Sequence, residues 1–263
     1  MSILKFIRAI VASALALLMV CHVQAQTLDQ IQKRGKVLIG VDLTTAPFGF
    51  TDAQLKPTGV DVEVAGLIAA GLGVPLEIVP VTGPNRISYL LTNKVDLVVS
   101  TFSITPERAR TISFSNPYAA TQIVLLAEKA KKFEKPADLA GKSVAVVRGT
   151  VQDTQLTLVA PKDAVIRRFD DDATAATALL SGQVEAIATG SVIGNELVKR
   201  GAQKQLELKF VLTQSTYSVG LRKGDHELLH WLNTTLYYYR LNGALAKVHE
   251  KFIGGPYPVM GSF

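Results

Sequence analysis

The sequence predicts an α/β protein made of two similar units, with the second unit inserted into the first and two strands connecting them. Short apolar runs alternate with helical patterns over residues 37–99, and a second series of the same kind begins at Lys142. A final apolar run at 217–222 then returns the chain to the first unit. Alternation of strands and helices predicts mostly parallel sheets with helices on their faces.

The N-terminus has the pattern of a secretory signal peptide. Two basic residues precede an apolar run at 9–20, and the small residues up to Ala25 resemble a cleavage site. This apolar run is short for a membrane-spanning helix. We therefore expect residues 1–25 to be removed and the mature chain to begin at Gln26. Cys21, the only cysteine, could instead mark a lipid anchor, although the bulky Val20 before it fits that chemistry poorly.

Composition indicates a globular protein and narrows its partners. Of the 263 residues, 48% are hydrophobic and 19% are charged, which is the balance of a folded chain and not of a disordered one. The formal net charge of +6 is spread without basic blocks, so nucleic acid is not an expected partner. Such a charge suits an anionic ligand or simply a basic surface. Once Cys21 is removed, the mature chain has no thiol for a disulfide or for catalysis.

The first unit is expected to hold six elements before its binding loop. In chain order they are a helix at 28–33, a strand at 37–41, a helix at 59–72, a strand at 76–81, a helix at 84–91 and a strand at 95–99. In open α/β sheets the ligand crevice lies beyond the carboxyl ends of the strands. Those ends carry Asp42, the loop with Phe48, the segment 83–86 and the hydroxyl cluster that begins at Ser100. We expect these four features to converge.

The segment after the third strand has the features of an anion receptor. Ser100, Thr101 and Ser103 supply hydroxyls, Thr105 is suited to cap a helix, and Arg108 follows in the first helical turn. Hydroxyls, free backbone N–H groups and a guanidinium at one point can bind a carboxylate or a phosphate. The alternative is an ordinary strand–loop–helix junction whose arginine faces solvent.

The second unit is expected to repeat the architecture and to supply a matching loop. Its elements are strands at 122–127, 144–147, 166–169 and 184–188, and helices that end near 159, at 180 and at 200. Thr150 can cap the first helix, and Gly149 before it allows a close approach of the backbone to the same carboxylate that Arg108 meets. The alternative is a plain capped helix. We expect the acidic run 170–172 to cap the next helix and not to bind a cation.

The chain is expected to return through a strand at 217–222 to helices at 227–241 and 244–252. Two crossings, near 118–122 and 213–217, would form a hinge between two lobes. The first lobe would then comprise 26–118 with 217–263, and the second lobe 119–216. A cleft between α/β lobes is a common place for a small polar ligand.

Two residues at the predicted crevice have open interpretations. Asp42 could accept a hydrogen bond from a ligand ammonium or fix the loop around Pro47. Phe48 could stack on a ligand or fill the local core. No phosphate-binding loop, nucleophile elbow or zinc signature is present in the sequence, so neither a cofactor nor a metal is expected.

Taken together, these segments resemble a known family, the polar amino acid group of periplasmic solute-binding proteins that serve ABC importers (bacterial extracellular solute-binding proteins, family 3). The matching segments, in order, are IGVD at 39–42, APF at 46–48, TGVDV at 58–62, VD at 95–96, SITPER at 103–108, FSNPY at 114–118, RGT at 148–150 and GLRKG at 220–224. The resemblance implies a two-lobed type II periplasmic binding protein fold, a periplasmic location, a monomer, and a membrane permease as partner.

The resemblance also implies roles for individual residues. Arg108 would grip the α-carboxylate of the ligand, assisted by Ser103 and by Thr150 from the other lobe. Ser100 and Thr101 would hydrogen-bond the ligand ammonium or carboxylate. The remaining matches are Asp42, which corresponds to a pocket acid, and the loop of Val151 and Gln152, which lines the cleft.

The sequence departs from the family at the position that usually pairs with the ligand ammonium. Gly190 stands where the family usually has an aspartate, and Thr45 and Gly83 replace usual aromatics. An unpaired buried ammonium would be costly. Either Asp42 compensates, or the ligand is not a standard α-amino acid, and Arg86 is compatible with an acidic side group on it.

An enzyme on the same scaffold is the alternative, because some relatives of this family are cyclohexadienyl dehydratases. Such chemistry needs a general acid in the cleft. Glu185 and Asp153 are the nearest candidates, but Glu185 is expected in the middle of a strand and no acid–base pair is evident. We therefore expect a binding protein and not an enzyme.

Overall fold

The computed structural model describes residues 27–261. The expected signal peptide, residues 1–25, and the expected mature start at Gln26 lie outside the described residues. Within 27–261, no helix has both the length and the apolar character needed to cross a bilayer.

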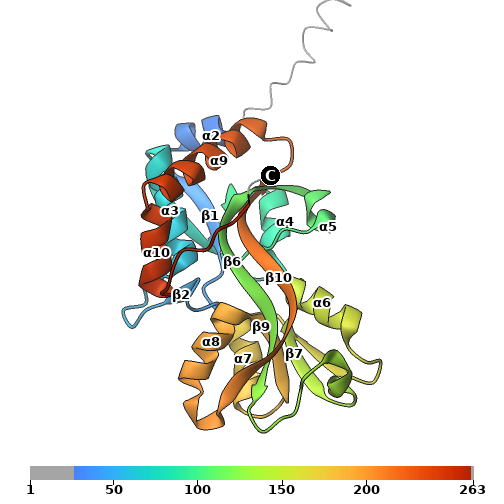
Figure 1. The fold of residues 1–263 in the computed structure, drawn as a ribbon. Helices are drawn as coiled ribbons and strands as arrows, with labels where there is room; N and C mark the ends of the chain where they lie inside the picture. Colours follow the sequence, from blue (N-terminus) through green and yellow to red (C-terminus); the bar gives the residue numbers. More distant parts are fainter. Residues whose placement is uncertain (1–26, 262–263) are drawn as a thin grey trace, which may run out of the picture.

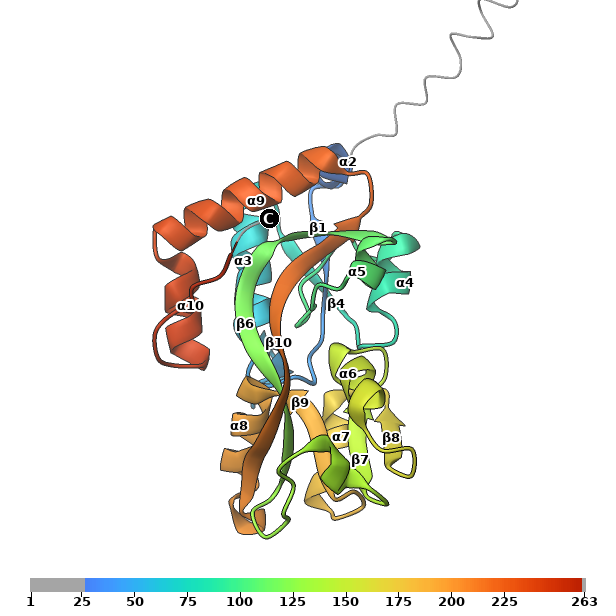
Figure 2. The same cartoon turned by 45° about the vertical axis from the view of Figure 1, so that its right-hand side comes forward.

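Two α/β lobes are joined by two long strands, which confirms the predicted fold class (Figure 1). β6 (Ile112–Glu128) and β10 (Leu206–Arg222) run antiparallel to each other through both lobes (Figure 2). They make the two lobes share one eight-stranded sheet, in the order β4-β1-β5-β10-β6-β9-β7-β8. The ladder between them is continuous in register from Thr213 to Tyr217 and has register shifts immediately on both sides.

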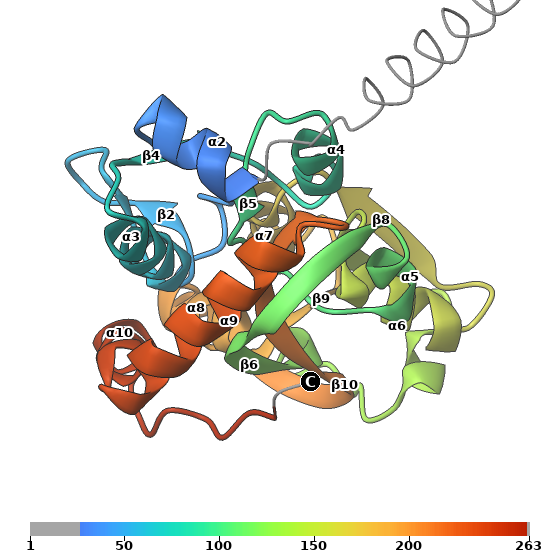
Figure 3. The ribbon, with the colours of Figure 1, turned by 90° about the horizontal axis from the view of Figure 1, so that it is seen from above.

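The first lobe contains the N-terminal and C-terminal parts of the chain. In it, β1 pairs in parallel with β4 and β5, and β10 pairs antiparallel with β5. Helix α9 crosses the top of this lobe and contacts α2, α3 and α10 (Figure 3). The elements are α2 (Thr27–Arg34), β1 (Val37–Val41), β2 (Phe50–Thr51), β3 (Pro57–Thr58), α3 (Val60–Leu72), β4 (Leu76–Pro80), α4 (Arg86–Leu91), β5 (Leu97–Val98), α5 (Pro106–Ala109), α9 (His226–Leu241) and α10 (Ala244–Phe252).

The second lobe repeats the pattern with a smaller set of elements. β7 pairs in parallel with β8 and β9, and β9 pairs antiparallel with β6. Two apolar clusters, one on each side of this sheet, bury the inward faces of its strands and helices. The elements are η1 (Pro136–Leu139), β7 (Ser143–Val147), α6 (Val151–Val159), β8 (Val165–Phe169), α7 (Asp172–Leu180), β9 (Ala186–Gly190), α8 (Ser191–Arg200) and η2 (Ala202–Lys204).

Three predicted helix caps are confirmed. The side chains of Thr105, Thr150 and Asp171 accept hydrogen bonds from backbone N–H groups in the first turns of α5, α6 and α7. Each cap satisfies an N–H group that has no partner within its helix. The caps therefore fix where these three helices begin, and all three beginnings face the cleft described below.

Three expectations about strands were wrong in extent. The strands expected at 122–127 and 217–222 are the ends of much longer strands of 17 residues each. The strand expected at 184–188 begins at Ala186, so Glu185 lies before it and not in its middle. The Glu185 side chain instead accepts from Lys131 at 3.1 Å and lies 3.6 Å from Lys142, which directly precedes β7. A short hairpin of β2 and β3 was not anticipated.

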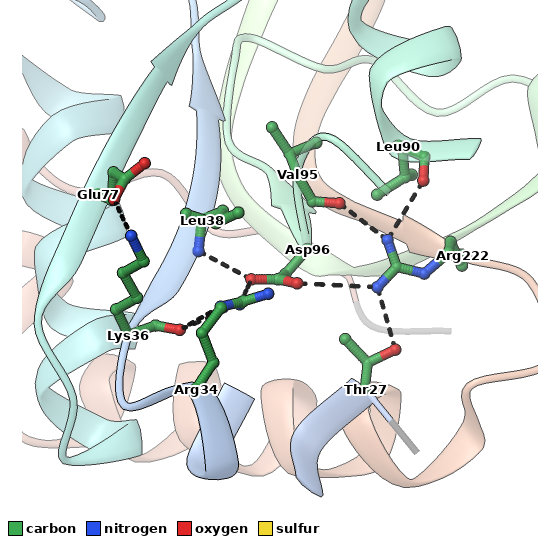
Figure 4. A network of polar contacts seen from close by, with 9 residues as sticks. All are labelled: Thr27, Arg34, Lys36, Leu38, Glu77, Leu90, Val95, Asp96 and Arg222. Atoms are coloured by element: carbon green, nitrogen blue, oxygen red, sulfur yellow. Dashed lines mark hydrogen bonds and ion pairs between the residues drawn. The ribbon is translucent and has the colours of Figure 1, made fainter. Parts of the chain in front are cut away.

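A buried carboxylate, that of Asp96, connects several segments of the first lobe (Figure 4). Asp96, 4% exposed, is paired with the Arg34 guanidinium and accepts from the Leu38 N–H at 2.8 Å. Arg222, at the end of β10, lies 3.9 Å from the other Asp96 oxygen and donates to the Val95 carbonyl at 2.8 Å. One side chain thus links α2, β1 and the start of β5 to the last strand of the sheet.

Candidate functional site

The two lobes touch across the cleft where the strand ends of the first lobe face the helix starts of the second. Arg108 Nη2 donates to the Gly149 carbonyl at 2.8 Å, and the Asp172 N–H donates to Thr44 Oγ1 at 3.3 Å. A side chain at Gly83 would meet the Arg148 carbonyl at 2.7 Å, so the absence of the usual aromatic permits this approach. The cleft is therefore closed in this structure.

Arg108 lies at the centre of the contact between the lobes. The Thr105 cap and Pro106 start the four-residue helix α5, which places Arg108 over the loop that precedes it. Its guanidinium donates to the Ser103 carbonyl at 2.6 Å and lies 5.2 Å from the centre of the Phe102 ring. Burial, with Arg86 nearby, lowers the pKa of Arg108 from its usual value. The guanidinium thus has partners in both lobes and can also bind an anion.

The hydroxyl loop is held in place by an acid that the sequence analysis did not single out. Asp61, fully buried, accepts from the Thr101 N–H at 2.8 Å and from the Tyr118 hydroxyl at 2.7 Å. Burial raises the pKa of Asp61 to about 7. Thr101 is held at a φ of 41° in this arrangement, and its N–H is not free for a ligand. An acid among the apolar positions of α3 was the available sequence signal.

The two predicted serines differ in their bonding. Ser103 Oγ accepts from Ser215 Oγ at 2.9 Å, which connects the loop to β10. Ser100 is fully buried, and its hydroxyl has no hydrogen-bond partner in the described part of the chain. The Ser100 hydroxyl is therefore available to a group that enters the cleft.

Arg86 lies deep in the first lobe and not at the surface of the cleft. It is 3% exposed, donates from Nη1 to the Ser100 carbonyl at 2.7 Å, and stacks 4.5 Å from the centre of the Phe102 ring. Burial lowers its pKa, whereas the carboxylates of Asp42 and Asp172 raise it. Its Nε has no partner among the described residues.

Asp42 and Phe48 both support the loop after β1. Asp42 Oδ1 accepts from the Thr44 N–H at 2.9 Å and from Thr44 Oγ1 at 2.6 Å, and burial raises the pKa of this acid. Phe48 is fully buried in the core of the first lobe, with its ring edge-on to Tyr217 at 5.1 Å between centroids. The structure places Phe48 beneath the cleft, as the core interpretation required.

The second lobe contributes the start of α6. Thr150 Oγ1 donates to the Val147 carbonyl at 2.7 Å and accepts from the Asp153 N–H at 3.3 Å, so its proton is not free for a ligand. Val151 lines a cavity of about 880 Å³ together with Arg108, Gly149 and Ser215. Gln152 is half-buried in the same turn but is not among the residues that line this cavity.

Tyr217 occupies the space that a side chain at Gly190 would need. Gly190 ends β9, and a Cβ built on it would lie 2.9 Å from the Tyr217 hydroxyl and 3.3 Å from Thr121 Oγ1. Tyr217 is 1% exposed, and its hydroxyl has no partner at hydrogen-bonding geometry within residues 27–261. The sequence analysis missed this tyrosine, because the contact joins β9 to β10 and depends on the folded sheet.

A second, smaller cavity also lies between the lobes. It measures about 120 Å³ and is lined by residues of both lobes, among them Thr44, Asp172 and Thr189. Asp172, in the first turn of α7, was expected only to cap that helix, but Asp171 makes the cap. Burial, with Asp42 nearby, raises the pKa of Asp172 to about 8.

The candidate acids for the alternative dehydratase activity are engaged elsewhere. Glu185 accepts from Lys131 at 3.1 Å and from the Ser143 N–H at 3.3 Å. Asp153 accepts from Arg168 at 2.9 Å. Neither carboxyl group is placed as a free general acid in the cleft.

Comparison with known proteins is consistent with a binding protein. The L-cystine-binding protein TcyJ of Escherichia coli is 29% identical over 229 residues, which are 86% of this chain and 86% of that protein. The solved structure of a mutant of ArgBP from T. maritima has a TM-score of 0.81 and 32% identity, and covers 87% of this chain and 100% of that chain. An ancestral amino acid-binding protein, a precursor of cyclohexadienyl dehydratase, has a TM-score of 0.78 and 35% identity over 87% of this chain and 100% of that one.

The family itself is shown by a match that spans almost all of the two lobes. The family described as bacterial extracellular solute-binding proteins, family 3, matches residues 37–255. The chain therefore belongs to family 3 of the bacterial extracellular solute-binding proteins.

Proposed function

We propose that this protein binds an amino acid between its two lobes and delivers it, in the periplasm, to the permease of an ABC importer. The observation that carries the proposal is the position of Arg108, which hydrogen-bonds the Ser103 carbonyl of one lobe and the Gly149 carbonyl of the other at 2.6 and 2.8 Å. A guanidinium at such a junction suits a planar carboxylate. Relatives named for binding cystine, glutamine and arginine support an amino acid as the ligand.

The proposed carboxylate subsite combines groups from both lobes. Arg108 turns its Nη2 from the Gly149 carbonyl to the ligand carboxylate. Ser103 can donate its hydroxyl proton to that carboxylate, because its oxygen already accepts from Ser215 at 2.9 Å. The first N–H groups of α6, at Val151 and Gln152, have no partner within the helix and favour an anion. Thr150 contributes by fixing the start of that helix.

The proposed lobes and hinge follow from the pairing of the two long strands. Segments 118–122 and 213–217 lie opposite each other, with Thr121 paired to Ser215 and Ala120 to Thr216. We assign 26–118 with 217–263 to the first lobe and 119–216 to the second. A ligand that bonds both lobes stabilises the closed form relative to the open form, and only that difference in affinity drives closure. The protein acts as a monomer in this proposal.

A thermal-shift screen followed by calorimetry tests the proposed function. The mature protein is mixed with the standard amino acids, L-cystine and small dicarboxylates at millimolar concentration. A ligand at about a hundred times its Kd stabilises the folded state by about 2.7 kcal/mol, which raises the Tm measurably. At least one amino acid should raise the Tm and bind with one-to-one stoichiometry. If no amino acid changes the Tm, the proposed function is wrong.

A further inference from the structure

Two carboxylates from different lobes lie on either side of Thr44, where the lobes contact each other. Asp42 follows β1 in the first lobe, and Asp172 lies in the first turn of α7 in the second. Thr44 connects them, because its hydroxyl donates to Asp42 Oδ1 at 2.6 Å and accepts from the Asp172 N–H at 3.3 Å. The closed form therefore brings two acids together across the boundary between the lobes.

Some carboxylate oxygens of these two acids accept no hydrogen bond from the described residues. Both hydrogen bonds to Asp42 fall on Oδ1, and the Asp172 carboxylate receives none from the described residues. The cation beside them, Arg86, is already bonded to the Ser100 carbonyl at 2.7 Å and stacked on Phe102. Burial raises the pKa values of Asp42 and Asp172, and the Asp42 carboxylate adds to the rise at Asp172, whereas Arg86 acts to lower both.

A second observation, independent of the acids, points to a bound molecule at the same place. Six buried side-chain polar atoms have no partner in the described part of the chain, and three of them belong to residues at the cleft: Ser100 Oγ, Thr189 Oγ1 and the Tyr217 hydroxyl. These three residues are at most 1% exposed, and they come from both lobes. Native interiors leave few such atoms unpaired, and each calls for an explanation. Thr189 also lines the 120 Å³ cavity with Thr44 and Asp172.

Other residues at the cleft are less well placed than these two acids to bind a cation between the lobes. Gly190 has no side chain, and the space beside it holds the Tyr217 hydroxyl. Asp61 is bonded to Tyr118 and to the Thr101 N–H. Asp171 is bonded to the Thr174 N–H as the cap of α7. Within the described chain Asp171 keeps one carboxylate oxygen free and Glu196 also lines the small cavity, but neither is joined to Thr44 across the lobes as Asp42 and Asp172 are.

We propose that Asp172, together with Asp42, binds a cationic nitrogen of the ligand in the closed cleft. This inference rests on the proposed function and narrows its ligand to a molecule with a carboxylate for Arg108 and a cationic nitrogen for the acid pair. It gives Asp172 a role beyond the helix cap expected from the sequence. It also makes an acidic side group next to Arg86 unfavourable, because Arg86 already shares its surroundings with two carboxylates.

The cation has a direct effect on closure in this arrangement. Because Asp42 and Asp172 belong to different lobes, only the closed form holds a cation between both carboxylates. The ligand nitrogen would thus favour the closed form over the open one, which is the condition for a ligand to shift a conformational equilibrium.

The test uses two pairs of probes that differ in one cationic nitrogen. L-arginine and L-citrulline have the same shape but differ in the charge of the side chain, and L-glutamine and glutaramate differ by the α-ammonium. The variants are Asp172→Asn and Asp42→Asn, and calorimetry measures the affinity of each for all four probes. Asp170→Asn is the matched control, since Asp170 belongs to the same acidic run but its side chain is 75% exposed and pairs with Arg148.

We expect the wild-type protein to prefer the cationic member of at least one pair, and the pair concerned identifies which nitrogen binds. Asp172→Asn and Asp42→Asn should each weaken that member at least about tenfold, with an effect under threefold on its partner, because a charge-assisted bond is lost. Asp170→Asn should stay within about twofold. A melting curve confirms that each variant is folded, and Asp42→Asn provides the second reading if Asp172→Asn misfolds.

Two results would contradict the reasoning in different ways. If folded Asp172→Asn and Asp42→Asn keep the wild-type preference, the acid pair does not bind a cation, although amino acid binding at Arg108 remains. If the wild-type protein binds none of the standard amino acids, the proposed function fails and this inference fails with it.

Discussion

Replacing Arg108 by alanine is expected to weaken ligand binding at least about tenfold. The guanidinium makes two hydrogen bonds in the closed cleft, at 2.6 Å to Ser103 and 2.8 Å to Gly149, and the proposed ligand carboxylate takes over the second. A hydrogen bond to a charged group contributes roughly 1.5–3 kcal/mol. The carboxylate therefore loses at least about 1.5 kcal/mol with the one bond that it takes over, and each 1.4 kcal/mol is a tenfold change in Kd.

Calorimetry with the amino acid found in the screen measures this loss directly. Arg108→Lys keeps the charge without the planar fork and should bind with intermediate affinity. Arg110→Ala is the matched control, because Arg110 is exposed two residues further along the same segment. The Tm without ligand must be compared as well, since Arg108 also joins the lobes. A folded Arg108→Ala protein with an affinity within twofold of wild type would refute the carboxylate role.

Three further predictions concern the groups that support the cleft. Asp96→Ala should lower the free energy of unfolding, measured by urea denaturation, by about 3 kcal/mol, because it leaves Arg34 and Arg222 without their buried partner. The control Glu77→Ala breaks an exposed pair with Lys36 and should change this free energy by less than about 0.5 kcal/mol. Burial raises the pKa of Asp61 from 3.8 to about 7, so the folded state holds this proton more tightly than the unfolded state does. The free energy of unfolding should therefore fall as the pH rises from about 4 to about 7. If this free energy depends on pH with the same slope in the wild-type protein and in Asp61→Asn, the prediction is wrong. Tyr217→Phe removes a buried hydroxyl that has no partner in the described chain. The Tm without ligand should therefore stay equal or rise, while the affinity for the ligand falls. An unchanged affinity would show that the hydroxyl does not contact the ligand.

Local signals in the sequence predicted the helix starts at the cleft. Thr105, Thr150 and Asp171 are caps in the structure. Capping depends on a few neighbouring residues, so a short segment of sequence is enough to predict it. The same signals brought Arg108 and the loop at 148–150 together as candidates, and the two segments are in hydrogen-bonding contact. Their role in binding remains a prediction.

Other features depend on contacts between distant parts of the chain and were not predictable in this way. The long strands β6 and β10 contain polar residues near the crossing, such as Gln122 and Gln214, which interrupt the apolar pattern that identifies a strand. Tyr217 approaches Gly190 only because the sheet places β10 and β9 on either side of β6. Asp172 was assigned to capping because three acids in a row lie at the start of α7, and only the folded chain shows that the middle one makes the cap.

The register shifts on both sides of Thr213–Tyr217 have a practical consequence for measuring the movement of the protein. Bulges bend and twist a strand locally, so the lobes should move relative to each other by bending at the two positions that flank this short regular ribbon. The distance between one dye on each lobe would then change in one direction as ligand is added. Since the only cysteine, Cys21, precedes the expected mature start, two introduced cysteines would be the only labelling sites of the mature chain. The protein is thus well suited to conversion into a fluorescent sensor of its own ligand.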